Sequence, residues 1–301
     1  MLSPARAAAL RPPLDRLYRA CAGPAAPADP IDCVRVYASS ADREIAAFVA
    51  AGLAFGRVAS IQSSVRAALS HMGPSPAAFV RAFDPHRDAG PFLPFVHRWV
   101  RGRDIVALLV ILRHMLDTAG SLEQFFLAGD DPASPDIGPG LESFGARARA
   151  VDLRPVYGRR DARPGVHAFF PLPSGASACK RLNLFLRWMV RRDDIDLGAW
   201  SRVSPARLIV PLDVHVVRVG RCLGLTTYAS PGWRMASSIT ASLRQIDPFD
   251  PVKYDFALCH LGMEGLCGFR TPAGDSRCPL RGVCRPRARR RPGSHRPSRP
   301  R

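Results

Sequence analysis

Lys180 and Asp213 are the residues of this chain whose types and surroundings most directly suggest chemistry. Lys180 is one of two lysines among 43 basic residues, and a lysine, unlike an arginine, can give up its proton and act as an amine nucleophile. Asp213 stands at the expected start of a helix, where backbone N–H groups keep a carboxylate ionised. The plainer interpretations are a solvated surface charge for Lys180 and a simple N-cap for Asp213.

An amine and an ionised carboxylate in one cleft suit cleavage of an N-glycosidic bond. The carboxylate stabilises the positive charge that develops on the sugar, and the amine attacks the anomeric carbon to leave a Schiff base. We therefore expect Lys180 and Asp213 to be catalytic residues that share one cleft.

Helices must position these residues, because apolar side chains recur at helical spacing along most of the chain. The pattern predicts helices over 39–55, 57–72, 75–83, 103–119, 122–127, 141–151, 177–192, 214–223, 231–245 and 252–263. Residues 128–139 are predicted to form a loop, and 154–175 an ordered connection. No series of β-branched runs alternates with the period of a strand, so the expected fold class is all-α.

The chain is expected to form one helical domain over 31–284 with an arm before it, over 1–30. Leu10, Leu14, Leu17 and Tyr18 offer a short helical face in this arm, and the rest is expected to be loosely held. Residues 285–301 contain eight arginines, no acid and no large apolar side chain. Such a composition cannot bury a core, so we expect a disordered Arg-rich tail there.

The charge balance favours a polyanionic partner. The chain has 43 Lys and Arg against 25 Asp and Glu, a net charge of +18 at pH 7. Nucleic acid is therefore the first expected partner, and a membrane surface the second. No uncharged apolar run is long enough to cross a membrane, and residues 1–11 lack the features of a signal peptide. We expect a monomer in the bacterial cytoplasm, associated with the nucleoid.

Three segments around the candidate residues carry a resemblance to a known family. They read Cys-Lys-Arg-Leu-Asn over 179–183, Pro-Leu-Asp-Val-His over 211–215 and Asp-Pro-Val-Lys-Tyr-Asp over 250–255, with Asp-Arg-Glu-Ile-Ala over 42–46 in support. The combination resembles the helix–hairpin–helix DNA glycosylase superfamily, in which a hairpin lysine is followed by an aspartate in a Val-Asp-x-His-type motif. Within it, the chain is most similar to an uncharacterised bacterial family, a conserved domain of unknown function, over roughly 29–284.

The resemblance implies a role for each matching residue. Lys180 falls on the Schiff-base lysine of bifunctional glycosylases, and Asp213 on the catalytic aspartate. The expected nucleic-acid-binding residues are Gly175, Arg181, Arg187, His215 and Arg218. Gly175 is the one glycine in the hairpin 172–179, where the superfamily has Gly-x-Gly. Enzymes of this type flip the target base out of the duplex into a pocket, so the expected partner is double-stranded DNA.

The Cys-rich C-terminal loop, 259–284, is the candidate metal site. Many relatives in the superfamily end in a four-cysteine iron–sulfur loop, and Cys267, Cys278 and Cys284 resemble three of its ligands. A cysteine near 275–276 is missing, which makes Cys259 the candidate fourth ligand. The alternatives are an iron–sulfur cluster, a zinc ion held by three or four of these thiolates, and a loop without metal. The other four cysteines are interpreted as buried apolar side chains.

The expected function is a base-excision DNA glycosylase with AP-lyase activity, acting on a damaged base such as an oxidised purine. The alternative is a non-catalytic helix–hairpin–helix protein that binds DNA or RNA. A third class is a metal-dependent regulator that senses redox conditions through the Cys-rich end.

Overall fold

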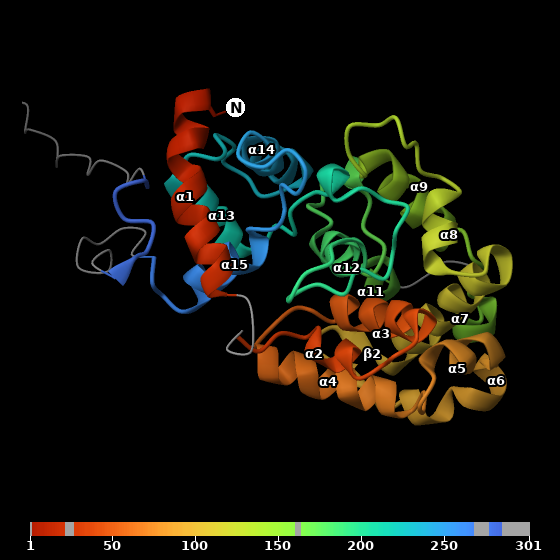
Figure 1. Ribbon diagram of the computed structural model, residues 1–301. Helices are drawn as coiled ribbons and strands as arrows, with labels where there is room; N and C mark the ends of the chain where they lie inside the picture. The colour runs from red at the N-terminus through yellow and green to blue at the C-terminus, as the bar shows by residue number, and fades with distance from the viewer. Residues whose placement is uncertain (1, 22–26, 160–163, 268–276, 285–301) are drawn as a thin grey trace, which may run out of the picture.

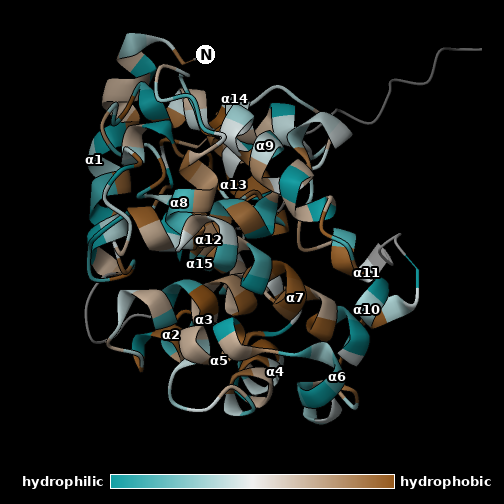
Figure 2. Cartoon of the chain, turned by 90° about the vertical axis from the view of Figure 1, so that its right-hand side faces the viewer, coloured by the Kyte–Doolittle hydropathy of each residue, from teal (hydrophilic) through white to brown (hydrophobic). Residues whose placement is uncertain are grey.

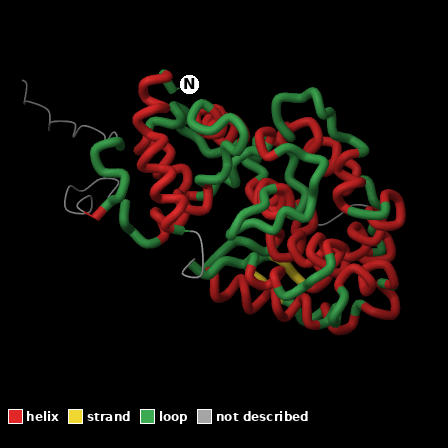
Figure 3. Tube along the Cα trace, in the orientation of Figure 1, coloured by secondary structure: helices red, strands yellow, loops and turns green. Residues whose placement is uncertain are grey.

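A computed structural model describes residues 2–21, 27–159, 164–267 and 277–284 of the chain. These residues are mostly helical (Figure 3), which confirms the expected all-α class at that level. The sheet found in these ranges is a small antiparallel hairpin of β1 (Val96–His97) and β2 (Val100–Arg101). No helix in the same ranges is long and apolar enough to cross a membrane. The predicted Arg-rich tail, 285–301, lies outside the described residues.

Ten helices in the described part of the domain lie close to the predicted ranges. In chain order the helices of the domain are α2 (Asp32–Arg35), α3 (Ser40–Gly52), α4 (Val58–Ser70), α5 (Pro76–Ala82), α6 (Pro85–Asp88), α7 (Gly102–Ala119), α8 (Leu122–Leu127), α9 (Gly138–Arg149), α10 (Arg154–Tyr157), α11 (Pro164–His167), α12 (Lys180–Val190), α13 (Val214–Leu223), α14 (Trp233–Arg244) and α15 (Asp255–Met263). Three 3-10 turns, η1 (Gly90–Phe92), η2 (Pro173–Gly175) and η3 (Pro205–Arg207), complete the set. The short helices α2, α6, α10 and α11 were not predicted, and the last two make the connection 154–175 partly helical.

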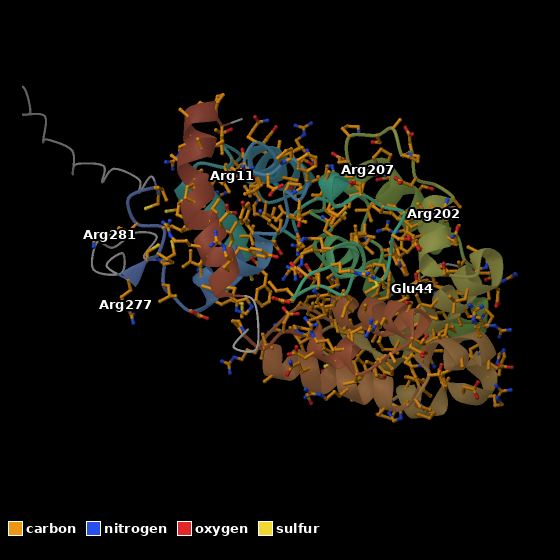
Figure 4. The ribbon with its side chains drawn as sticks, in the orientation of Figure 1. Arg11, Glu44, Arg202, Arg207, Arg277 and Arg281 are labelled. Atoms are coloured by element: carbon orange, nitrogen blue, oxygen red, sulfur yellow. The ribbon has the colours of Figure 1, made fainter. Side chains whose placement is uncertain are left out.

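The helical face expected at Leu10, Leu14, Leu17 and Tyr18 belongs to a longer helix, α1 (Pro4–Ala20), which is docked and not loosely held. Leu10 and Leu14 on its inner face are fully buried. The guanidinium of Arg11, labelled in Figure 4, donates to the carbonyl oxygen of Ile246 at 2.7 Å. The hydroxyl of Tyr254 donates to Asp15 at 2.6 Å. A buried apolar stripe and these hydrogen bonds hold α1 against the segment between α14 and α15.

Two groups of helices meet around α12 (Figure 1). Helices α2 to α6 lie along the bottom of that view, α7 and α8 on its right, and α1, α13, α14 and α15 on the left. Helix α12 packs on α3, while α13 packs on α15. The brown, hydrophobic parts of α7, α12 and α13 lie inside the molecule in Figure 2.

Aromatic rings fill the contact between α3 and α12. Phe48 lies 5.1 Å from the ring centre of Phe185 in an edge-on arrangement and 5.4 Å from that of Phe170 in a stacked one. Such pairs add about 0.5–1.5 kcal/mol beyond the burial of their area. This contact fixes the body of α12, so the position of its first residue, Lys180, is also fixed.

Glu44, in the segment 42–46, has a structural role. Its carboxylate is buried and accepts the backbone N–H groups of Leu122 and Glu123, at 3.1 and 3.0 Å, which open α8. It also accepts the indole N–H of Trp200 at 2.6 Å. Burial raises the pKa of Glu44, and these hydrogen bonds oppose that rise. Glu44 (Figure 4) thus caps a neighbouring helix and is a structural residue.

Candidate functional site

A pocket of about 620 Å³ lies between the two groups of helices. One wall comes from residues 54–61, before and within α4. Most of the remaining lining comes from α12, from residues 211–221 before and within α13, and from α15, and it carries Lys180, Asp213 and Asp255. The pocket therefore brings together side chains that are far apart in the sequence.

Asp213 serves two neighbours with its two carboxylate oxygens. Oδ1 accepts the backbone N–H groups of His215 and Val216, at 2.9 and 2.8 Å, and so caps α13. Oδ2 lies 3.9 Å from Nζ of Lys180. The plain N-cap interpretation and the functional one are thus compatible, because the cap uses one oxygen and leaves the other in the pocket.

Lys180 is the first residue of α12 and is placed by an unusual backbone. Cys179 before it has φ 49° and Ala176 has φ 59°, both in the left-handed region that favours glycine. The Lys180 side chain keeps 37% of its surface exposed, and that of Asp213 keeps 12%. The two predicted catalytic residues therefore share the pocket, with the amine at its mouth.

Cys259 belongs to this pocket and not to a cysteine cluster. Its thiol donates to Oδ2 of Asp213 at 3.0 Å, from the middle of α15. Burial, followed by the nearby Asp213 charge, raises the pKa of Cys259 well above its usual value. The thiol stays protonated, so it acts as a hydrogen-bond donor to the carboxylate oxygen that faces Lys180.

Arg187 is buried at the base of the pocket and does not fit the phosphate contact expected for it. Only 2% of the residue is exposed. Its guanidinium lies 2.6 Å from Asp255 and 3.2 Å from Asp196, both buried. A side chain enclosed by two carboxylates has no face for a DNA backbone, and we assign it a structural role.

Asp255 was missed by sequence reasoning, although it ends the segment 250–255. Burial raises its pKa to about 7; the Arg187 charge opposes the rise and Asp213 adds to it. Asp29, another residue lining the pocket, also has its pKa raised by burial. The signal for Asp255 was its place in the motif, while nothing around Asp29 distinguishes it in the sequence.

The other expected nucleic-acid-binding residues lie around the pocket in different settings. Arg181 is half-buried, with its guanidinium 5.4 Å from the ring centre of Phe55, and burial lowers its pKa to about 10. His215 and Arg218 line the pocket from α13, Arg218 on its exposed side. Gly175 is exposed at the end of η2, outside the pocket lining.

The cysteines of the C-terminal region associate differently from the expectation. The neighbouring thiol of Cys267, followed by burial and by the thiol of Cys284, raises the pKa of Cys222 on α13. Cys278, between Cys267 and Cys284 in the sequence, is buried. Cys259, in contrast, is bonded to Asp213. Among the described residues, no group of three or more His, Cys, Asp or Glu side chains is arranged to hold a metal ion.

Comparison with known proteins identifies the family. A family model described as "Protein of unknown function (DUF2400)" matches residues 29–264. The match covers well over half of the chain, so the chain belongs to this family, and the expectation of an uncharacterised family of unknown function is confirmed. The matched range contains Lys180, Asp213 and Cys259 but not α1. Searches of curated proteins and of solved structures gave no match.

Proposed function

We propose that this protein is a DNA glycosylase with AP-lyase activity and a helix–hairpin–helix glycosylase fold. One observation carries the proposal: Nζ of Lys180 and Oδ2 of Asp213 lie 3.9 Å apart in the same pocket. The pocket volume, about 620 Å³, lies within the usual range for a small-molecule site and leaves room for a nucleobase.

The two residues divide the chemistry between them. The amine of Lys180, in its unprotonated form, attacks the anomeric carbon of the flipped nucleotide. The N-glycosidic bond breaks, and its electron pair leaves with the base, which takes up a proton. Oδ2 of Asp213 faces the positive charge that develops on the sugar and stabilises it. Opening of the sugar ring then yields a Schiff base on Lys180.

The partner under this proposal is double-stranded DNA, and an oxidised purine is the proposed lesion class. The net charge of +18 supports a polyanionic partner. The protein would act as a monomer in base-excision repair at the bacterial nucleoid. The resemblance at 179–183 and 211–215 supports the enzyme class. The short distance between Lys180 and Asp213 supports their assignment as its catalytic pair.

Borohydride trapping on a panel of lesion-bearing duplexes tests the proposal. Borohydride reduces a Schiff base to a stable covalent complex. Lys180→Arg and Lys253→Arg are matched variants, because each removes one of the two lysines and keeps its charge. We expect trapping by the wild type and by Lys253→Arg, and none by Lys180→Arg.

A different outcome would favour the non-catalytic alternative. If the wild type binds duplex DNA but is trapped on no substrate and releases no base, the protein is a binding module for DNA or RNA. The hairpin 172–179, in which Ala176 and Cys179 hold the left-handed positions, is the feature that favours this second candidate.

The proposed chemistry uses no metal, since both reacting groups belong to the chain. The set Cys259, Cys267, Cys278 and Cys284 does not fit an iron–sulfur cluster or zinc site, because Cys259 is engaged by Asp213. A thiolate-bound metal would have to use Cys222 in its place. Metal analysis of the purified protein and of the Cys222→Ser and Cys259→Ser variants distinguishes the set with Cys222 from the set with Cys259. Loss of metal in one variant identifies the cysteine that binds it.

A further inference from the structure

The β1–β2 hairpin is fixed next to the pocket by His97. This buried ring is bonded on both sides: Nδ1 lies 2.9 Å from the hydroxyl of Ser64 on α4, and Nε2 lies 3.1 Å from the carbonyl oxygen of Phe55. The residues at the turn are Arg98, with φ 52°, and Trp99. Because His97 is anchored to two elements, the turn has a defined position.

Trp99 presents a large aromatic surface to solvent at the edge of the pocket. Its ring is stacked on that of Phe55, with 4.1 Å between centroids and 11° between planes. Phe55 in turn lines the pocket. Trp99 nevertheless keeps 52% of its surface exposed. The indole therefore has one face on Phe55 and the other accessible from outside.

Exposed arginines flank this aromatic pair along the chain. Arg57, Arg98 and Arg103 are exposed, and none of them lies within 4.0 Å of a carboxylate in the described part of the chain. Arg98 lies against Gly56, another pocket residue: φ of Gly56 is +120°, and a Cβ there would be 3.0 Å from Nε of Arg98. Glycine at this position lets the guanidinium lie beside the pocket wall.

We propose that Trp99 is a stacking residue for a nucleobase of the bound strand, with Arg57 and Arg98 facing the phosphates on either side of it. A nucleic-acid strand offers the flat faces of its bases and an anionic phosphate backbone. The exposed indole suits the first, and the exposed guanidinium groups suit the second. The inference rests on the proposed function for its partner, nucleic acid, but not on the chemistry of Lys180.

Binding of undamaged oligonucleotides, single-stranded and duplex, tests this role directly. We expect Trp99→Ala to weaken binding about fivefold to a hundredfold, the range for loss of one base stack, and Trp99→Phe to recover most of it. Phe249→Ala is the matched control, because Phe249 is 81% exposed but lies between Asp247 and Asp250. Its binding should equal that of the wild type.

Tryptophan fluorescence gives a second readout that does not depend on affinity. Trp188 and Trp200 are buried, and the fourth tryptophan, Trp233, is half-buried, so the measurement is made in a Trp233→Phe background, where stacking on Trp99 should quench the emission on addition of oligonucleotide. The quenching should be absent in Trp99→Phe. Quenching that persists in Trp99→Phe, or wild-type affinity in Trp99→Ala, overturns the proposal.

The outcomes separate this inference from the proposed function. A wild type that is trapped on a lesion, with Trp99→Ala binding normally, contradicts the stacking role and leaves the glycosylase. A wild type that is never trapped but loses affinity in Trp99→Ala supports the stacking role and contradicts the glycosylase. A wild type that binds no oligonucleotide contradicts both.

Discussion

The two ends of α12 carry basic side chains in opposite environments. At its start, Lys180 is 37% exposed and lies 3.9 Å from a single carboxylate oxygen. Two turns later, Arg187 is buried between Asp196 and Asp255, and Arg191 is buried among Asp193, Asp196 and Asp250. The start of α12 leaves a cation available to a ligand. The end of α12 uses cations to join the helix to α15 and to the loop that follows α12.

The difference shows how the pocket can be both reactive and stable. A loosely paired amine costs little to keep at the surface, since exposed ion pairs contribute about 0–1 kcal/mol. Buried guanidinium groups are tolerated when carboxylates compensate their charge, as Asp196 and Asp255 do for Arg187. Substitutions at the start of α12 should therefore change activity, and substitutions at its end should change stability.

Arg187→Ala should have the largest effect on stability. It leaves Asp255 buried without its cation, although Asp196 keeps Arg191, and removing one partner of a buried pair costs about 3–5 kcal/mol. Chemical denaturation of the variant and the wild type measures the loss. Lys180→Ala is the control from the other end of the helix and should stay within about 0.5 kcal/mol of the wild type. Equal losses in both variants would contradict the comparison.

Asp213→Asn should lower activity with little loss of stability. Asparagine caps a helix as well as aspartate does, but it lacks the charge that faces the sugar. We expect base release to fall about 100- to 1,000-fold, as when one group that stabilises transition-state charge is removed. Asp213→Ala should lose about 1 kcal/mol of stability in addition, because the cap is lost as well. Single-turnover base release measures the role of Oδ2 in the reaction, and thermal melting measures the role of Oδ1 in capping α13.

Cys259→Ala should have a smaller effect on base release. The thiol positions Oδ2 of Asp213 through one hydrogen bond, which contributes about 0.5–1.5 kcal/mol. We expect up to about tenfold slower release, with recovery in Cys259→Ser, which retains a donor. A Cys259→Ala variant with unchanged rates and an unchanged pH profile would show that the thiol only fills space.

The smallest expected effect is a pH dependence of stability from His260 on α15. Burial lowers the pKa of His260; Glu264 and Asp213 oppose this, and Arg187 and His215 add to it. Below about pH 6.5, the ordinary value, the unfolded chain takes up a proton that the folded chain binds less readily. The free energy of unfolding should therefore fall as the pH drops through that value. His260→Gln should reduce the slope, whereas His86→Gln, at an exposed site, should not.

The sequence was informative wherever the evidence is local. The helix at 122–127 and the helix start at Val214 are set by caps and apolar spacing within a few residues, and both were predicted. The Lys180 and Asp213 pair was predicted from residue chemistry and a motif, and the structure places the two in one pocket.

Features that depend on distant partners were not predicted. The cysteine that contacts Cys267 and Cys284 is Cys222, which lies far from them in the sequence and has no spacing signal. Arg187 reads as an exposed cation until its two carboxylates are brought to it by folding. The β1–β2 hairpin has two residues in each strand, too few to show a period.

Helix α1 has a consequence for the order in which the molecule is made. Its bonds reach Ile246 and Tyr254, and Arg6 joins it to the carbonyl oxygens of Leu223 and Val283. The ribosome synthesises α1 before these partners, so the helix cannot make these contacts until they have been synthesised. Contacts of such long sequence separation slow folding, and the amphipathic face of α1 stays uncovered throughout translation. Docking of α1 therefore depends on residues that are far from it in the chain.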